Sequence, residues 1–181
     1  MYNYLDETRY SMSVFFENEM DMPIPEHYQD IVSDIIVAAL DFCECPYESE
    51  INVIFTDDAG IQTINKEFRA IDAPTDVLSF PLVDYEEPGD FNGLEDTPED
   101  YFNQDTGELM LGDIILNVDR IAKQALEYGH TRRREVAFLT AHSMLHLFGY
   151  DHVDDEERLV MEEMQEKILT MKGYTRENEQ E

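Results

Sequence analysis

Three histidines lie within eleven residues of the sequence, with a glycine between the second and the third. The stretch reads His142-Ser-Met-Leu-His146-Leu-Phe-Gly149-Tyr-Asp-His152. Helix positions four apart lie one turn apart on the same face, so His142 and His146 can bind one metal ion together. Gly149 tolerates the left-handed conformation that ends a helix, which lets the chain turn back and bring His152 to the same ion. The pattern predicts a late helix, a tight turn and a metal site where the two meet.

The type of metal site follows from the number of ligands. Three imidazoles leave one tetrahedral position for water, which is typical of a catalytic zinc site and not of a closed structural one. Nickel and copper also accept three imidazoles. The alternative is a set of unrelated core or surface histidines. The other two histidines, His27 and His130, lie in polar neighbourhoods without evident partners, and we expect neither to belong to a site.

The spacing His-x-x-x-His-x-x-Gly-x-x-His is also that of metzincin proteases, in which the residue after the first histidine is a glutamate that acts as general base. Here that residue is Ser143. A hydroxyl does not take a proton from metal-bound water at neutral pH, so hydrolysis of peptides by that mechanism is disfavoured. A protease would need another base, and Asp151 is the nearest candidate.

Apolar residues along the chain alternate between strand and helix spacing. Strands are expected at 12–18, 51–55, 77–82 and 111–118. Helices are expected over Ile31 to Leu40, from the Thr56 to Asp58 cap candidates to Phe68, from Asp119 to Gly129, from Thr131 to Gly149, and from Asp155 to Gly173. This uneven alternation predicts an α+β (α/β-like) fold, a single sheet of about four strands covered by helices.

One segment breaks the pattern. Residues 84–108 contain ten Asp or Glu and no Lys or Arg, without a sustained period, so we expect a long, mobile acidic loop or insertion. We expect residues 1–181 to form one metal-dependent hydrolase domain with a flexible tail after about residue 173. Cys43 and Cys45 are too close in sequence for a useful disulfide and are expected to be reduced thiols.

The charge balance argues against a generic nucleic-acid binder. The chain has 12 basic and 42 acidic residues, a net charge of −30, whereas nucleic-acid binders usually carry a basic face. More than half of the basic residues gather in two stretches: Lys66, Arg69, Arg120, Lys123, Arg132, Arg133 and Arg134. They form either an RNA-facing strip or a solvated face paired with carboxylates.

The first residues resemble no targeting signal and no apolar stretch is long enough for a membrane span, so we expect a soluble, cytoplasmic protein.

Two long motifs and one short motif resemble a known family. The stretch from His142 to His152 is similar to the zinc motif of the YbeY family, bacterial endoribonucleases and ribosomal RNA maturation factors. The second motif is Asn65-Lys-Glu-Phe-Arg69-Ala-Ile-Asp-Ala-Pro-Thr-Asp-Val-Leu-Ser-Phe-Pro81, and the third is Leu-Gly-Asp-Ile-Ile at 111–115. The resemblance runs from about Val14 to Met171. The acidic segment is longer and more charged than is usual between these motifs.

The resemblance implies a single-strand-specific, zinc-dependent endoribonuclease that matures the 3′ end of small-subunit ribosomal RNA and acts in ribosome quality control. It implies one Zn²⁺ per chain, held by His142, His146 and His152. The implied partners are single-stranded RNA, ribosomal RNA and the small ribosomal subunit or ribosome-associated proteins, and neither DNA nor a membrane. Two other functions stay open: a ribosome-assembly factor with a structural zinc, and a metalloprotease.

Two further residues are candidates for the chemistry. The resemblance implies that Arg69 binds the scissile phosphate through its planar guanidinium. The alternative is a surface arginine or a salt bridge to Asp72 or Asp76. Asp151 can accept a hydrogen bond from a ligand histidine or a proton from water, and a turn cap is the alternative. Asp76 and Ser79 can line the same cleft.

Overall fold

The computed structural model describes residues 2–3 and 12–175 and contains one mixed β-sheet. Its strands are β1 (Tyr2–Asn3), β2 (Met12–Asn18), β3 (Ser49–Thr56), β4 (Val77–Pro81) and β5 (Leu109–Asn117). The four predicted strands are all present, and the two-residue β1 adds to the edge. The last residues of the predicted flexible tail, 176–181, lie outside the described residues.

The sheet order β1-β2-β3-β5-β4 places the two central predicted strands, β3 and β5, side by side. β2, β3 and β5 run parallel, whereas β4 is antiparallel to β5. β4 is an edge strand and ends at Pro81, where the missing backbone N–H costs no ladder hydrogen bond. This edge matters for function because β4 lies against α5 (Arg132–Leu147), the helix that carries His142 and His146.

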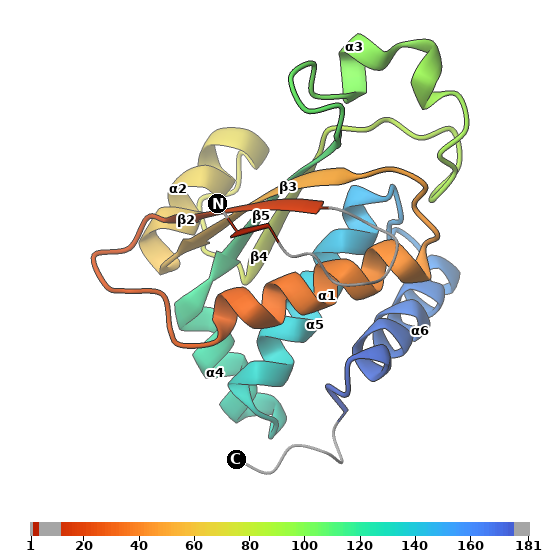
Figure 1. Cartoon of the computed structure of the whole chain (residues 1–181). Coiled ribbons are helices and arrows are strands. Elements are labelled where there is room, and N and C mark those ends of the chain that lie inside the picture. Colours follow the sequence, from red (N-terminus) through yellow and green to blue (C-terminus); the bar gives the residue numbers. More distant parts are fainter. Residues whose placement is uncertain (1, 4–11, 176–181) are drawn as a thin grey trace.

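The helices are α1 (Tyr28–Phe42), α2 (Asp58–Arg69), the short α3 (Pro98–Tyr101), α4 (Val118–Tyr128), α5 (Arg132–Leu147) and α6 (Asp155–Met171). Figure 1 shows α1, α5 and α6 on one side of the sheet, with α2 on the other. The α+β fold predicted from the sequence is confirmed. Among the described residues, no helix has the length and apolar character needed to cross a membrane.

The sheet separates the buried apolar residues into two clusters, one on each of its faces. Ile114 and Leu116 of β5 point into the main core, which α1 and α5 cover, whereas Ile115 points to the other face. There it packs with Ile61 of α2 and Leu78 of β4. Side chains that alternate along a strand face opposite sides of the sheet, so continuously apolar strands require helices on both faces.

Helix α5 begins and ends where the sequence predicted. The hydroxyl of Thr131 accepts a hydrogen bond from the backbone N–H of Arg134 and caps the first turn. At the other end Gly149 has a φ of 88°, and the N–H of Tyr150 donates to the carbonyl of Leu145 at 3.0 Å. A side chain at Gly149 would also meet the ring of Tyr85 at 3.0 Å. Glycine is therefore required here both by conformation and by space.

The acidic segment is more ordered than a plain loop. It contains a 3₁₀ turn, η1 (Leu94–Asp96), as well as α3, and it projects from the end of the sheet in Figure 1. Phe91 and Leu94 are buried in the main core, and the N–H of Gly89 donates to the carbonyl of Phe148 at 2.8 Å. The segment is thus attached to the C-terminal end of α5, beside the turn at Gly149.

Candidate metal centre

The three histidines predicted to bind a metal converge in the structure. Their candidate ligand atoms all lie within 4.8 Å of one another. Nε2 of His142 and Nε2 of His146 are 3.0 Å apart, and the ring of His152 lies 5.4 Å and 5.1 Å from theirs, centroid to centroid. Two nitrogen ligands of one ion, each about 2.0–2.1 Å from it, have a similar separation. The group could hold a metal ion.

A backbone carbonyl orients the second histidine. Nδ1 of His146 lies 2.9 Å from the carbonyl oxygen of Tyr150. A carbonyl only accepts, so Nδ1 carries the proton and donates it, which leaves the lone pair of Nε2 directed at the other histidines. The turn at Gly149 therefore has two roles: it brings His152 to the site and supplies the acceptor that fixes the tautomer of His146.

The first histidine is contacted by a residue that sequence reasoning missed. Nε2 of Gln165, on α6, lies 3.2 Å from Nδ1 of His142, and Gln165 is 2% exposed. Rotating the side-chain amide by half a turn brings its oxygen, in place of its nitrogen, to Nδ1 of His142. This orientation is required when His142 binds a metal through Nε2, because Nδ1 then carries a proton to donate. A polar residue on the buried face of an amphipathic helix was the available sequence signal.

The protonation of the histidines also suits a metal. Burial, together with the neighbouring rings of His146 and His152, lowers the pKa of His142 to about 4. Burial likewise lowers the pKa of His146 below its usual range. Both rings are therefore neutral at physiological pH, and a neutral imidazole is the form that binds a metal.

A cavity of about 500 Å³ opens over the histidines. It is lined by the three histidines and by residues of the second sequence motif and of the turn after Gly149: Arg69, Thr75, Asp76, Val77, Ser79, Pro81 and Asp151. The structure thus brings together every residue that the sequence proposed for the site, including Asp76 and Ser79.

Arg69 reaches this cavity from the last turn of α2. Its Nη2 donates to the carbonyl of Ser79 at 3.2 Å, and its guanidinium carbon lies 5.8 Å from the ring centre of Phe80. Within the described part of the chain it makes no salt bridge to Asp72 or Asp76, the alternative considered from the sequence. Asp72 forms a salt bridge with Lys66 instead, with Oδ2 and Nζ 2.8 Å apart. The charge of Arg69 is therefore available to an anion in the cavity.

The two residues flanking the ligands have different surroundings. Oδ1 of Asp151 accepts a hydrogen bond from the backbone N–H of His152 at 2.8 Å, the geometry of a turn cap, while the residue also lines the cavity. Ser143 is fully buried, and its hydroxyl has no hydrogen-bond partner among the described residues. Ser143 points into the protein and cannot act as a base on a substrate.

The clustered basic residues do not form a continuous strip, which was one of the two arrangements considered from the sequence. Arg134 is 2% exposed and pairs with Glu166 at 2.7 Å. Arg120 and Lys123 both bind Asp58, at 3.1 Å and 3.0 Å. Carboxylates therefore neutralise most of the seven clustered basic groups, and Arg69 is the one that lines the histidine cavity.

The expectation that His130 lacks a partner is wrong. Its Nε2 lies 3.0 Å from Oε2 of Glu135, and both side chains are largely buried. Glu135 lies five residues after His130, at the start of α5, so the pair spans the N-terminal cap of that helix. The residues next to His130 in the sequence did not indicate this contact. Burial, reinforced by the negative charge of Asp76, raises the pKa of Glu135 to about 7.

Comparisons with known proteins identify the family of this chain. The family described as Endoribonuclease YbeY matches residues 15–173. The endoribonuclease YbeY of Agathobacter rectalis is 54% identical over 165 residues, which cover 91% of this chain and 100% of the relative. That of Lachnoclostridium phytofermentans is 54% identical over 158 residues, 87% of this chain and 96% of the relative. The enzyme of a Thermoanaerobacter species is 38% identical and covers the same shares.

A solved structure supports the fold alone. The solution structure of TM1509 from Thermotoga maritima superposes with a TM-score of 0.50 at 20% sequence identity, covering 88% of this chain and 91% of that protein. Fold and site define an α+β protein with a histidine centre able to hold one metal ion. The chain belongs to the endoribonuclease YbeY family, as its three sequence motifs predicted.

Proposed function

We propose that this protein is a zinc-dependent endoribonuclease that cleaves single-stranded RNA and acts in maturation of the 3′ end of small-subunit ribosomal RNA and in ribosome quality control. Family membership supports the endoribonuclease activity and its place in ribosomal RNA maturation. The observation that carries the metal dependence is the convergence of His142, His146 and His152 in a cavity that also contains Arg69.

The chemistry of the donor set favours zinc. Three neutral imidazoles suit Zn²⁺ and leave a position for solvent. When bound, the ion lowers the pKa of a coordinated water to about 7 and withdraws charge from a phosphoryl oxygen. Tyr150 and Gln165 hold the rings of His146 and His142 in the orientation that such binding needs.

Arg69 and Asp151 supply the remaining functional groups. The guanidinium of Arg69 can bind the non-bridging oxygens of the scissile phosphate, since its charge is not neutralised by a carboxylate. Asp151 keeps His152 in place through the backbone and lines the cavity, where a carboxylate can accept a proton from water. These two roles are part of the proposal.

The charge distribution favours a targeted substrate over free RNA. Twelve acidic residues and one basic residue lie within 1–50, and ten acidic residues lie within 84–108. This excess of negative charge repels a polyanion at long range, so encounter with free RNA is expected to be slow. We therefore propose that the small ribosomal subunit or a ribosome-associated protein delivers RNA to this protein. A cytoplasmic location is part of the same proposal. Nanomolar, salt-sensitive binding of free RNA would contradict this.

The experiment that tests the function compares two forms of one RNA. Zinc-replete protein is incubated with an end-labelled single strand and with the same strand in a perfect duplex, and zinc is counted by elemental analysis. We expect one zinc per chain and cleavage of the single strand alone. Unfolding on metal removal, with no cleavage at any zinc level, would favour an assembly factor with a structural zinc.

A metalloprotease finds little support, because the position of the protease base holds the buried Ser143. Release of peptides from casein, abolished in Asp151→Asn, would revive that function.

Gln165 is expected to tune metal affinity. Replacing it with leucine removes the polar partner of Nδ1 of His142 at nearly constant volume, so Zn²⁺ affinity should fall about 10–100-fold. The measurement is competition with a chromophoric chelator. Gln165→Glu, whose carboxylate still accepts from Nδ1, should retain most of the affinity. If the leucine variant binds zinc as tightly as the wild type, Gln165 does not position His142.

A further inference from the structure

A second cavity, of about 470 Å³, lies next to the metal centre. Its volume is within the range of small-ligand sites, about 300–1,000 Å³. Tyr128, His130, Glu135 and Phe138 form much of its lining, and Asp76 lines both this cavity and the one over the histidines. The two cavities are therefore neighbours that share a wall.

Aromatic rings form one side of the second cavity. The rings of Tyr128 and His130 are stacked, with centroids 6.0 Å apart and an interplanar angle of 28°. Tyr128 is 60% exposed, so its ring extends this wall towards solvent. Phe138 adds a half-buried ring from α5. Exposed aromatic faces beside a nuclease centre are suited to stacking with an unpaired base.

Polar side chains form the rest of the lining: the carboxylates of Asp76, Glu135 and Glu166, the amide of Gln124 and the guanidinium of Arg134. Glu135 is 1% exposed and holds His130 at 3.0 Å, while Asp76 accepts from the amide of Gln124 at 3.2 Å. The cation in the cavity, Arg134, is already paired with Glu166 and donates to a backbone carbonyl as well. A phosphate would find no free cation among these lining residues, whereas a base that presents an amino group would find carboxylate acceptors in Asp76 and in Glu166, whose side chain is 55% exposed.

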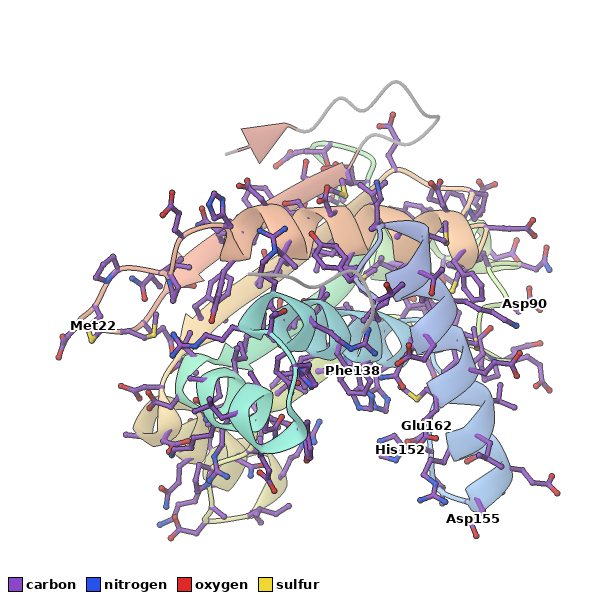
Figure 2. All side chains as sticks on the ribbon, turned by 90° about the horizontal axis from the view of Figure 1, so that it is seen from below. Met22, Asp90, Phe138, His152, Asp155 and Glu162 are labelled. Carbon is purple, nitrogen blue, oxygen red and sulfur yellow. The ribbon has the colours of Figure 1, made fainter. Side chains whose placement is uncertain are left out.

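One face of α5 connects the two cavities. Glu135, Phe138, His142 and His146 follow each other at spacings of three, four and four residues, which place them on one side of a helix. At about 1.5 Å of rise per residue, Phe138 lies about 6 Å along the axis from His142, a span that one nucleotide can bridge. Seen from below in Figure 2, both Phe138 and His152 lie between α6 and α4.

We propose that this second cavity is a base subsite of the endoribonuclease, which binds an unpaired nucleobase carrying an exocyclic amino group on a nucleotide next to the scissile phosphate. The inference rests on the proposed function and adds a substrate preference to it. The aromatic wall selects an unstacked base, and hence a single strand. The carboxylates favour cytosine, adenine or guanine over uracil, whose exocyclic groups are both carbonyl acceptors.

The first test measures binding without cleavage. Cytidine and uridine monophosphates are titrated into the full-length, metal-free protein, and resonances of Tyr128 and Phe138 are followed by NMR. We expect tighter binding of the cytidine nucleotide, because only its base carries an exocyclic amino group. The phosphate and sugar are the same in the two nucleotides, so a difference in affinity reports on the base. Tyr128→Ala should weaken its binding about 10-fold. Leu126→Ala, which removes an 82% exposed side chain of the same helix outside the cavity, should leave it unchanged.

The second test uses cleavage of an oligouridine that carries a single cytidine. The wild-type protein with zinc should cut preferentially beside the cytidine, and Tyr128→Ala should lose this preference while Leu126→Ala keeps it. Uniform cleavage along the oligomer by the wild type would overturn the subsite and leave the proposed function intact. Absence of any cleavage would overturn the proposed endoribonuclease function. The nucleotide titration alone would then test whether the second cavity binds a base. Equal binding of the two nucleotides would count against it.

Discussion

Replacement of His142 with alanine is expected to abolish zinc binding and with it the cleavage of single-stranded RNA. His142 donates one of three imidazoles, and its Nε2 faces that of His146 at 3.0 Å. Two remaining ligands hold zinc too weakly for a stable open site. Charge stabilisation by the ion is worth several kcal/mol, so the rate should fall about 1,000-fold or more, since about 1.4 kcal/mol corresponds to each tenfold change.

The measurement combines elemental analysis with an end-labelled RNA assay. His27→Ala is the matched control, because His27 is exposed and lies outside the histidine centre. We expect it to keep both the zinc and the activity. Circular dichroism of both variants establishes that they are folded. Cleavage by His142→Ala at the wild-type rate would mean that a contaminating nuclease, and not this protein, acts on the RNA.

Replacement of Arg69 with glutamate should separate catalysis from metal binding. Arg69 lines the histidine cavity and is not a ligand, so the variant should retain one zinc per chain. The substitution removes a donor to the phosphate and places a negative charge where the transition state gathers negative charge. Loss of one such donor costs about 100- to 1,000-fold in rate, and the reversed charge adds to this loss.

Arg133→Glu provides the control for net charge. Arg133 is exposed at the start of α5 and does not line the cavity, so the same change of charge occurs away from the site. We expect it to alter cleavage only slightly, and mostly at low salt. A similar loss in both variants would show that Arg69 acts through the overall field and not by contact with the phosphate.

The sequence predicted those parts of the fold that depend on local pattern. The cap at Thr131 and the end of α5 before Gly149 follow from side-chain chemistry within a few residues, and both are confirmed. Short runs of apolar residues likewise located β2 to β5 to within about two residues. The three histidines could be brought together in advance because helix geometry relates His142 to His146, and the turn at Gly149 returns His152 to them.

Long-range partners were beyond such reasoning. Arg134 looks like its exposed neighbours in the sequence, yet it is buried against Glu166, thirty-two residues later, because α6 packs along α5. Phe91 and Leu94 stand singly among acidic residues, so no periodicity marked them as core. Gln165 contacts His142 only because α6 packs against α5 in one particular register. Each of these contacts depends on tertiary packing, which a single sequence does not display.

The face of α5 that carries Glu135, Phe138, His142 and His146 makes this helix sensitive to length. One residue inserted between Phe138 and His142 would rotate the two halves of the face by about 100° relative to each other and separate the metal centre from the neighbouring cavity. The acidic segment, in contrast, is held by Gly89, Phe91 and Leu94 near its start and by the hydrogen bond from Asn103 to Glu50 near its end, so residues 95–100 between these contacts can vary in number without turning either site. Related chains should therefore differ in length between the second and third motifs and keep α5 free of insertions and deletions.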